Sequence, residues 1–116
     1  MNYSQLVNSE NGLMIVNHVE HANTWFMRLV GLLNKSNIDQ EKALLLKPCK
    51  SIHTIGMRFS IDVIFLDKYN RVIKLKRNMK PNRICFSNIK THSVLELSVG
   101  SIDCCNISIG TELLFK

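Results

Sequence analysis

The sequence contains no apolar run long enough to cross a bilayer and few residues that would disrupt a packed fold. Its longest unbroken apolar runs, such as those at 43–46 and 63–66, are far shorter than the ~20 residues that a membrane-spanning helix needs. Only two prolines and five glycines occur among 116 residues, and the hydrophobic fraction of 46% and charged fraction of 21% are typical of globular chains. We therefore expect a folded domain with its own core and no membrane span.

A secretory signal and a disulfide framework are also missing. The chain starts with Met1-Asn2-Tyr3-Ser4-Gln5, without the basic start and long apolar stretch of a signal peptide. No Cys-x-x-Cys pair occurs, and a reducing compartment would keep the cysteines as thiols. The four cysteines are Cys49, Cys85, Cys104 and Cys105. The sequence therefore predicts a cytoplasmic protein whose cysteines behave as small buried hydrophobes.

The charge balance is basic, with fifteen Lys and Arg against nine Asp and Glu and a formal charge of +6. Such a charge attracts polyanions weakly and identifies no partner. Part of it lies in a basic group formed by Lys74, Lys76, Arg77, Lys80 and Arg83. This group has no interleaved aromatic residues and matches no nucleic-acid motif. Lysines that prevent edge-to-edge association of strands are the favoured interpretation, and RNA binding is the weaker alternative.

Short strands dominate the predicted secondary structure. The sequence predicts them at 13–16, at 43–46 before Pro48, in a hairpin spanning 61–79, at 93–99 and at 112–115. In the hairpin, Ile73 and Leu75 alternate with lysines, which places an apolar face inward. Residues 1–10 are polar and aperiodic, so we expect a loose N-terminal arm, followed by a single domain at 11–116.

One clear helix is predicted over about 24–33, because Trp25, Leu29 and Leu32 recur at spacings of four and three. A short helical turn is predicted at about 101–106. Many short strands with one clear helix favour a mainly β fold (β-rich α+β) over a parallel α/β sheet. We expect a small antiparallel barrel or sandwich.

Three separated segments carry a specific family resemblance. The central one reads Cys-Lys-Ser-Ile-His-Thr-Ile-Gly-Met at 49–57 and Ile-Asp-Val-Ile-Phe-Leu-Asp at 61–67. Upstream are Arg28 and the Gly-Leu pair at 31–32, and downstream is Val-Leu-Glu-Leu at 94–97 with a glycine at 100. In order and spacing they resemble the "domain of unknown function 192" family, also called uncharacterised protein family 0127, from about residue 22 to the end.

The resemblance implies a single-domain, mainly antiparallel β fold with a helical excursion, and it implies no known activity. The family usually has an aspartate after the glycine of the final turn, where this chain has Gly110-Thr111. The motif residues that could carry function form one predicted cluster: Cys49, Ser51, His53, Thr54, Met57, Asp62 and Glu96.

Asp62 and His53 are the centre of this predicted cluster. Asp62 lies inside an apolar run, where an ionised carboxylate costs several kcal/mol unless donors or a cation meet it. It could act as a base or ligand anchor, or accept backbone N–H groups at a strand start. The imidazole of His53 suits proton transfer or ligand binding near neutrality, and a structural histidine is the alternative. Glu96 either closes the cluster or faces solvent.

A nucleophilic Cys49 and a metal site are weaker alternatives. Four residues of extended chain span about 13 Å, so a pair between Cys49 and His53 needs a turn. A reactive thiolate also needs an electropositive, partly open setting. A metal site that combines these two with Asp62 and His18 or His21 has no recognised ligand spacing, so no metal site is predicted. Met57 is either core or the wall of an apolar pocket.

The leading functional hypothesis is a non-enzymatic module that binds a small ligand or a protein partner through the face containing Ser51, His53, Thr54 and Asp62. The alternative is a hydrolase-like enzyme in which His53 and Asp62 act as acid and base, with Cys49 or a metal supplying the nucleophilic or electrophilic step. The sequence identifies no cofactor, and we expect a monomer or a weak dimer.

Overall fold

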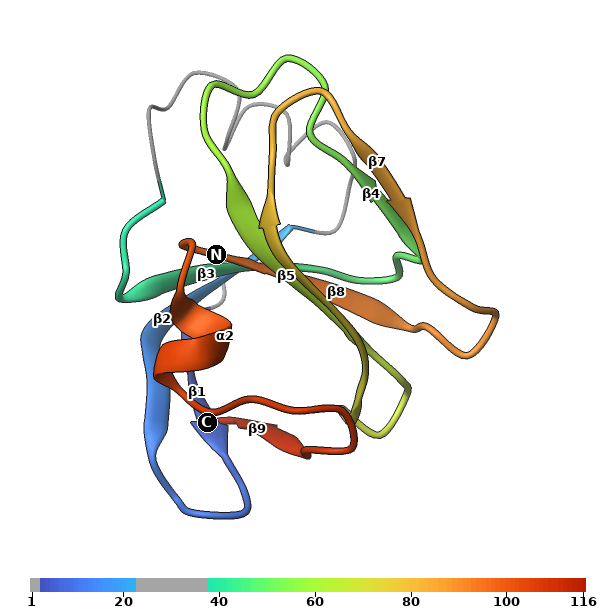
Figure 1. Cartoon of the computed structure of the whole chain (residues 1–116). Coiled ribbons are helices and arrows are strands. Elements are labelled where there is room, and N and C mark those ends of the chain that lie inside the picture. Colours follow the sequence, from blue (N-terminus) through green and yellow to red (C-terminus); the bar gives the residue numbers. More distant parts are fainter. Residues whose placement is uncertain (1–2, 23–37) are drawn as a thin grey trace.

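The structure is a computed structural model, and it describes residues 3–22 and 38–116. Strands make up about half of this part of the chain (Figure 1). They are β1 (Tyr3–Asn8), β2 (Met14–Ala22), β3 (Lys42–Leu46), β4 (Ser51–His53), β5 (Ile61–Leu66), β6 (Val72–Met79), β7 (Ile84–Phe86), β8 (Ser93–Leu97) and β9 (Leu113–Phe115). A single turn of helix, α2 (Ser101–Cys104), follows β8. The predicted β-rich class is confirmed, and the helix predicted over 24–33 lies outside the described residues.

Seven strands form one sheet in the order β6-β5-β8-β3-β2-β1-β9. The sheet curls into a half-barrel, because its outer ends approach each other where Arg71 and Glu112 form an isolated bridge. Beside this bridge, the N–H of Val72 donates to the carbonyl of Thr111 at 2.9 Å, and the N–H of Gly110 donates back to Val72 at 2.7 Å. β4 and β7 form a separate antiparallel pair. In Figure 1 this pair lies on one side of the seven-stranded sheet, and α2 lies on the other.

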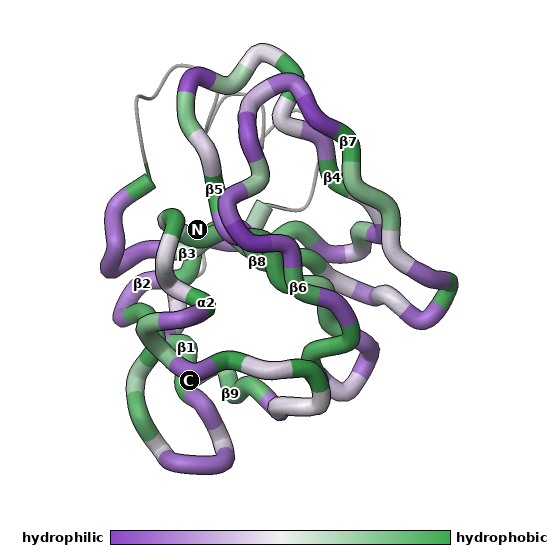
Figure 2. Tube along the Cα trace, in the orientation of Figure 1, coloured by the Kyte–Doolittle hydropathy of each residue, from purple (hydrophilic) through white to green (hydrophobic). Residues whose placement is uncertain are grey.

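Two apolar clusters pack on opposite faces of the seven-stranded sheet. The first cluster fills the inside of the curl, with residues from all seven strands of the sheet and from α2. The second cluster lies beneath the β4–β7 pair and includes Ile52 and Cys85 from those two strands. Hydrophobic residues concentrate along β3 and β8, at the centre of the molecule (Figure 2). β5 contributes to both clusters and is buried at every position, which explains why its sequence is apolar without alternation.

The strands predicted at 13–16, 43–46, 61–79, 93–99 and 112–115 are confirmed as β2, β3, the β5–β6 hairpin, β8 and β9, with shifted boundaries. The helical turn predicted at 101–106 is confirmed as α2. None of the described helices is long and apolar enough to span a membrane.

The loose arm predicted at residues 1–10 is wrong, because residues 3–8 form β1. This strand pairs with β2 on one side and β9 on the other, and Leu6 is completely buried in the first cluster. Only Leu6 and Val7 are adjacent apolar residues in a polar stretch, so the sequence shows no periodicity there. The strand is stabilised by partners that are distant in sequence.

Candidate functional site

Asp62 is a buried carboxylate held by three backbone N–H groups. The whole Asp62 residue is only 1% exposed. One oxygen, Oδ1, accepts from the N–H of Asn78 at 2.9 Å, and Oδ2 accepts from the N–H groups of Gly100 at 3.1 Å and Ile102 at 3.0 Å. Hydrogen bonds to an ionised acceptor are stronger than neutral ones, so they offset the cost of burying the charge. Of the two roles that the sequence allows for Asp62, this geometry supports the structural one.

The backbone on either side is shaped to meet this carboxylate. The β5–β6 register shifts between the pairs Ile61–Met79 and Val63–Lys76, and within that bulge Asn78 adopts a left-handed conformation with φ of 50°. At the start of α2, Gly100 has a φ of 95° and no side chain that could cap the helix. Asp62 caps it from another strand instead, so a single carboxylate joins β5, the end of β6 and α2.

Thr54 is also committed to the fold. Its buried hydroxyl donates to the carbonyl of Lys80 at 2.6 Å and accepts from the N–H of Arg83 at 3.0 Å. Its own N–H donates to the carbonyl of Arg83 at 2.8 Å. These bonds fasten the end of β4 to the loop between β6 and β7. Met57, in the same motif, is buried in the second cluster as a core residue.

The structure does not bring Asp62 and His53 together. Asp62 points to the face of β5 that carries Ile64 and Leu66, inside the curl. His53 is half-buried in β4, which packs Ile52 against the opposite face of the sheet. An acid–base pair between these two residues therefore has no geometric basis.

Of the remaining predicted residues, Cys49 and Glu96 lie on the face of the sheet opposite Asp62. The thiol of Cys49 donates to the carbonyl of Ser51 at 2.9 Å, while Ser51 itself is exposed. Glu96 is completely buried on β8, on the same face as Val94 of the second cluster, so its predicted alternative of facing solvent is wrong. Asp62 and Glu96 therefore lie on opposite faces of the sheet.

None of the four cysteines forms a disulfide, and one of their thiols is disfavoured as a thiolate. Burial raises the pKa of the Cys105 thiol above its ordinary value of 9.0, and neighbouring Cys104 raises it further. Within residues 3–22 and 38–116, no three His, Cys, Asp or Glu side chains gather in a way that could hold a metal ion.

The side chains of two members of the basic group contact residues far from them in the sequence. Arg77 Nε donates to Asp103 Oδ1 at 2.8 Å in an exposed ion pair. Lys74 Nζ donates to the carbonyl of Phe86 and lies 5.7 Å from the centre of the Phe65 ring. The other members of the group, Lys76, Lys80 and Arg83, line a small cavity of about 300 Å³. RNA binding by this hairpin stays a prediction.

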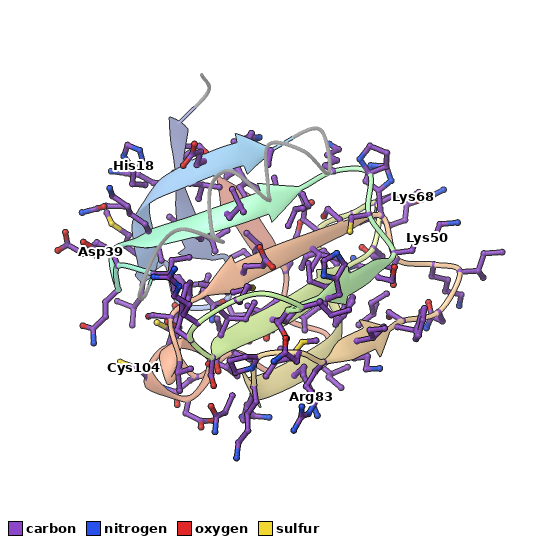
Figure 3. The ribbon with its side chains drawn as sticks, turned by 90° about the horizontal axis from the view of Figure 1, so that it is seen from above. His18, Asp39, Lys50, Lys68, Arg83 and Cys104 are labelled. Atoms are coloured by element: carbon purple, nitrogen blue, oxygen red, sulfur yellow. The ribbon has the colours of Figure 1, made fainter. Side chains whose placement is uncertain are left out.

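A larger cavity, of about 640 Å³, lies where three loops meet and was not predicted from the sequence. We call it the basic cavity. It is lined by Lys50, Asp67, Lys68, Tyr69, Arg71, Ile89, Lys90, Thr91 and His92. Lys50 comes from the loop between β3 and β4, the residues at 67–71 form the β5–β6 turn, and those at 89–92 precede β8. Figure 3 shows Lys50 and Lys68 on the same side of the molecule.

Backbone hydrogen bonds hold the three loops of the basic cavity together. The N–H of His92 donates to the carbonyl of Leu66 at 2.8 Å, and the carbonyl of His92 accepts from the N–H of Cys49 at 3.0 Å. Within the β5–β6 turn, Asp67 Oδ1 accepts from the N–H groups of Tyr69 and Arg71, at 2.8 and 3.0 Å. The walls of the cavity are therefore fixed by the fold.

Thr91 is the unusual residue in this wall. It is only 2% exposed, and its hydroxyl has no hydrogen-bond partner among the described residues. A buried hydroxyl without a partner costs about 1–3 kcal/mol, so native proteins rarely retain one without a reason. Sequence reasoning missed this site because its four cations are spread over some forty positions and its threonine belongs to no motif.

These features define a small β-rich domain that is built on a half-barrel sheet and contains an internal structural carboxylate. The model of the domain of unknown function 192 (DUF192) family, described as "Uncharacterized ACR", matches residues 6–115. The chain belongs to this family, as the motifs at 49–57, 61–67 and 94–97 predict.

Two sequence relatives carry a family name and no activity. A UPF0127 protein from Thermococcus sibiricus is 35% identical over 112 residues, which cover 93% of this chain and 72% of the relative. Another from Thermococcus gammatolerans is 31% identical over 109 residues, covering 90% and 71%. A protein of unknown function from Novosphingobium aromaticivorans, solved as a crystal structure, superimposes with a TM-score of 0.80 at 18% identity, covering 97% of this chain and 83% of that one. That likeness shows the fold alone.

Proposed function

We propose that this protein is a non-catalytic binding module that takes a small molecule in the basic cavity. The observation that supports this proposal is a cavity of about 640 Å³ whose lining includes Thr91, a buried residue with a hydroxyl that has no partner among the described residues. Small-molecule sites typically measure about 300–1,000 Å³ and present a few polar groups of this kind. Because the family has no assigned activity, the ligand must be argued from the residues.

The proposed site lies at the start of the motif region and not at its centre. The sequence hypothesis places the site at His53 and Asp62, but Asp62 already accepts three backbone N–H groups. Lys50, between Cys49 and Ser51 of the predicted cluster, lines the basic cavity. The start of the motif therefore borders the proposed site, while Thr54, Met57 and Asp62 stabilise the fold.

The same geometry favours binding over catalysis. A nucleophile and its base must come within about 3 Å of each other. Asp62 is inside the curl, His53 is in the strand pair on the other face, and the Cys49 thiol is hydrogen-bonded to a backbone carbonyl. The hydrolase-like alternative therefore lacks the acid–base pair of His53 and Asp62 on which it depends.

Native mass spectrometry of the full chain, purified without denaturation, tests this proposal. We expect a co-purifying mass on the unmodified protein that disappears in Ile89→Trp, because Ile89 is 84% exposed in the cavity wall and a larger ring would fill the space. The matched control is Ile55→Trp, at a 51% exposed position outside the cavity, which should keep the mass. Retention of the mass in Ile89→Trp would place the bound molecule elsewhere, and an unmodified chain without any adduct would argue against small-molecule binding.

A further inference from the structure

We propose that the ligand of the basic cavity is a phosphate monoester of a small organic molecule, and that the Thr91 hydroxyl donates a hydrogen bond to its phosphate. This inference rests on the proposed function and names the chemical class of its ligand. It is supported by the charges of the cavity, by the unpartnered hydroxyl and by the apolar part of the wall.

The charges favour an anion. Three lysines and one arginine, Lys50, Lys68, Arg71 and Lys90, line the cavity from three different loops, and none forms an ion pair with a described residue. The one carboxylate in the wall, Asp67, accepts two backbone N–H groups of its own turn through Oδ1. Cations gathered around a concave surface attract an anionic ligand more strongly than the same charges spread over a flat one.

The unpartnered hydroxyl favours a ligand rich in hydrogen-bond acceptors. Thr91 lines the cavity, and an acceptor oxygen placed there would supply the partner that its hydroxyl lacks in the fold. A phosphate monoester is a dianion with three acceptor oxygens on one centre. Its three oxygens provide enough acceptors for this hydroxyl, for the fork of Arg71 and for a lysine.

The apolar part of the wall indicates an organic group on the phosphate. Tyr69 is 61% exposed and Ile89 is 84% exposed, and both line the cavity. Lys68 Nζ lies 5.2 Å from the centre of the Tyr69 ring, which places a cation beside an aromatic surface. This arrangement suits a ligand that has a charged end and an apolar or aromatic end.

The test is a titration of the full chain with phenyl phosphate, followed by ¹H–¹⁵N NMR, with neutral phenol and inorganic phosphate as comparison probes. We expect saturable shifts at the amides of Lys68, Thr91 and His92, and an affinity that falls as salt is raised. Thr91→Val should weaken phenyl phosphate binding about five- to tenfold, the effect of one lost hydrogen bond, and Thr91→Ser should stay within about twofold of the unmodified chain. Inorganic phosphate should bind at the same amides but more weakly, and phenol should not bind.

Charge variants distinguish binding at a specific site from diffuse electrostatic attraction to the protein surface. Lys90→Ala should weaken phenyl phosphate binding severalfold, whereas Lys80→Ala removes an equal charge outside the basic cavity and should have little effect. Thr91→Val should also be at least as stable to urea as the unmodified chain without ligand, because it removes a buried hydroxyl that has no partner. Loss of binding without loss of stability would exclude misfolding as the cause.

Four results would overturn the inference. They are unchanged phenyl phosphate affinity in Thr91→Val, equal weakening by Lys80→Ala and Lys90→Ala, binding of phenol as tight as that of phenyl phosphate, and displacement of phenyl phosphate by a much lower concentration of a single-stranded oligonucleotide. The third result, together with a co-purifying mass that is lost in Ile89→Trp, would reject the phosphate while leaving the small-molecule proposal intact.

Discussion

A carboxylate in the middle of a buried strand is stable here because the backbone surrounds it with donors. Asp62 accepts from Asn78, Gly100 and Ile102, which belong to segments far from it in the sequence. Thr54 is satisfied in the same way by the loop at 80–83. Thr91 differs from both, since its hydroxyl has no such partner among the described residues. At the scale of the residue, this difference separates polar groups that build the fold from the one hydroxyl that, in our proposal, a ligand would satisfy.

Replacing Asp62 should destabilise the protein strongly. In Asp62→Asn, the amide group cannot accept from all three N–H donors, so we expect a loss of about 2 kcal/mol in the free energy of unfolding, and about 3 kcal/mol or more in Asp62→Ala. Urea unfolding followed by circular dichroism measures the change. The control is Asp103→Asn, whose carboxylate is 71% exposed in its ion pair and should change stability by less than ~0.5 kcal/mol. Equal effects at the two positions would contradict the structural role of Asp62.

At the scale of the element, the short helix α2 depends on a cap that its own sequence does not provide. Its N-cap residue is Gly100, in a left-handed conformation, and the donor groups at 100 and 102 point to a carboxylate on β5. The bulge that brings Asn78 to the same carboxylate lies in β6. Both elements therefore owe their local geometry to a side chain of β5, a strand that β6, β7 and β8 separate from α2 in the chain.

Gly100→Ala should destabilise the protein through backbone conformation alone. A Cβ added at Gly100 would meet no atom within 4 Å, but its φ of 95° is unfavourable for residues with a side chain. We expect a loss of about 1–2 kcal/mol for Ala and a smaller loss for Asn, which tolerates left-handed conformations better. Thermal unfolding of the two variants gives the order. An alanine variant as stable as the unmodified chain would show that this turn relaxes to another conformation.

At the scale of the whole molecule, the last strand joins the two ends of the curled sheet. β9 pairs with β1, and Glu112 just before it forms the bridge to Arg71 at the start of β6. Leu113 is completely buried in the first cluster, and its N–H donates to the carbonyl of Asn70 at 2.9 Å. Strand β9 therefore contributes Leu113 to the core.

Two adjacent leucines in β9 provide a matched test of this packing. Leu113→Ala should cost about 2–5 kcal/mol, the usual range for a buried leucine, because it leaves a cavity in the first cluster. Leu114 points the other way and is 39% exposed, so Leu114→Ala should cost less than ~1 kcal/mol. Urea unfolding of both variants measures the difference. Similar losses at the two positions would mean that β9 does not close the curl as described.

Local sequence patterns were sufficient to predict much of the fold. The runs at 43–46 and 61–66 and the alternation at 93–97 each identify a strand, because burial on one or both faces leaves a direct trace in the sequence. β1, β4 and β7 left little trace, since β4 and β7 have three residues each and β1 gains its partners from the far end of the chain. The family, too, could be identified from the motif residues alone.

The sequence by itself determined the family, the β-rich class and the fact that Asp62 needs partners, because each of these depends on the identity and spacing of nearby residues. Only the tertiary structure decided which partners Asp62 has, that His53 lies across the sheet from it, and that Lys50, Arg71 and Thr91 meet at one cavity. The physical reason is that a curled sheet brings together loops that are some forty residues apart. Local sequence carries no signal of such contacts.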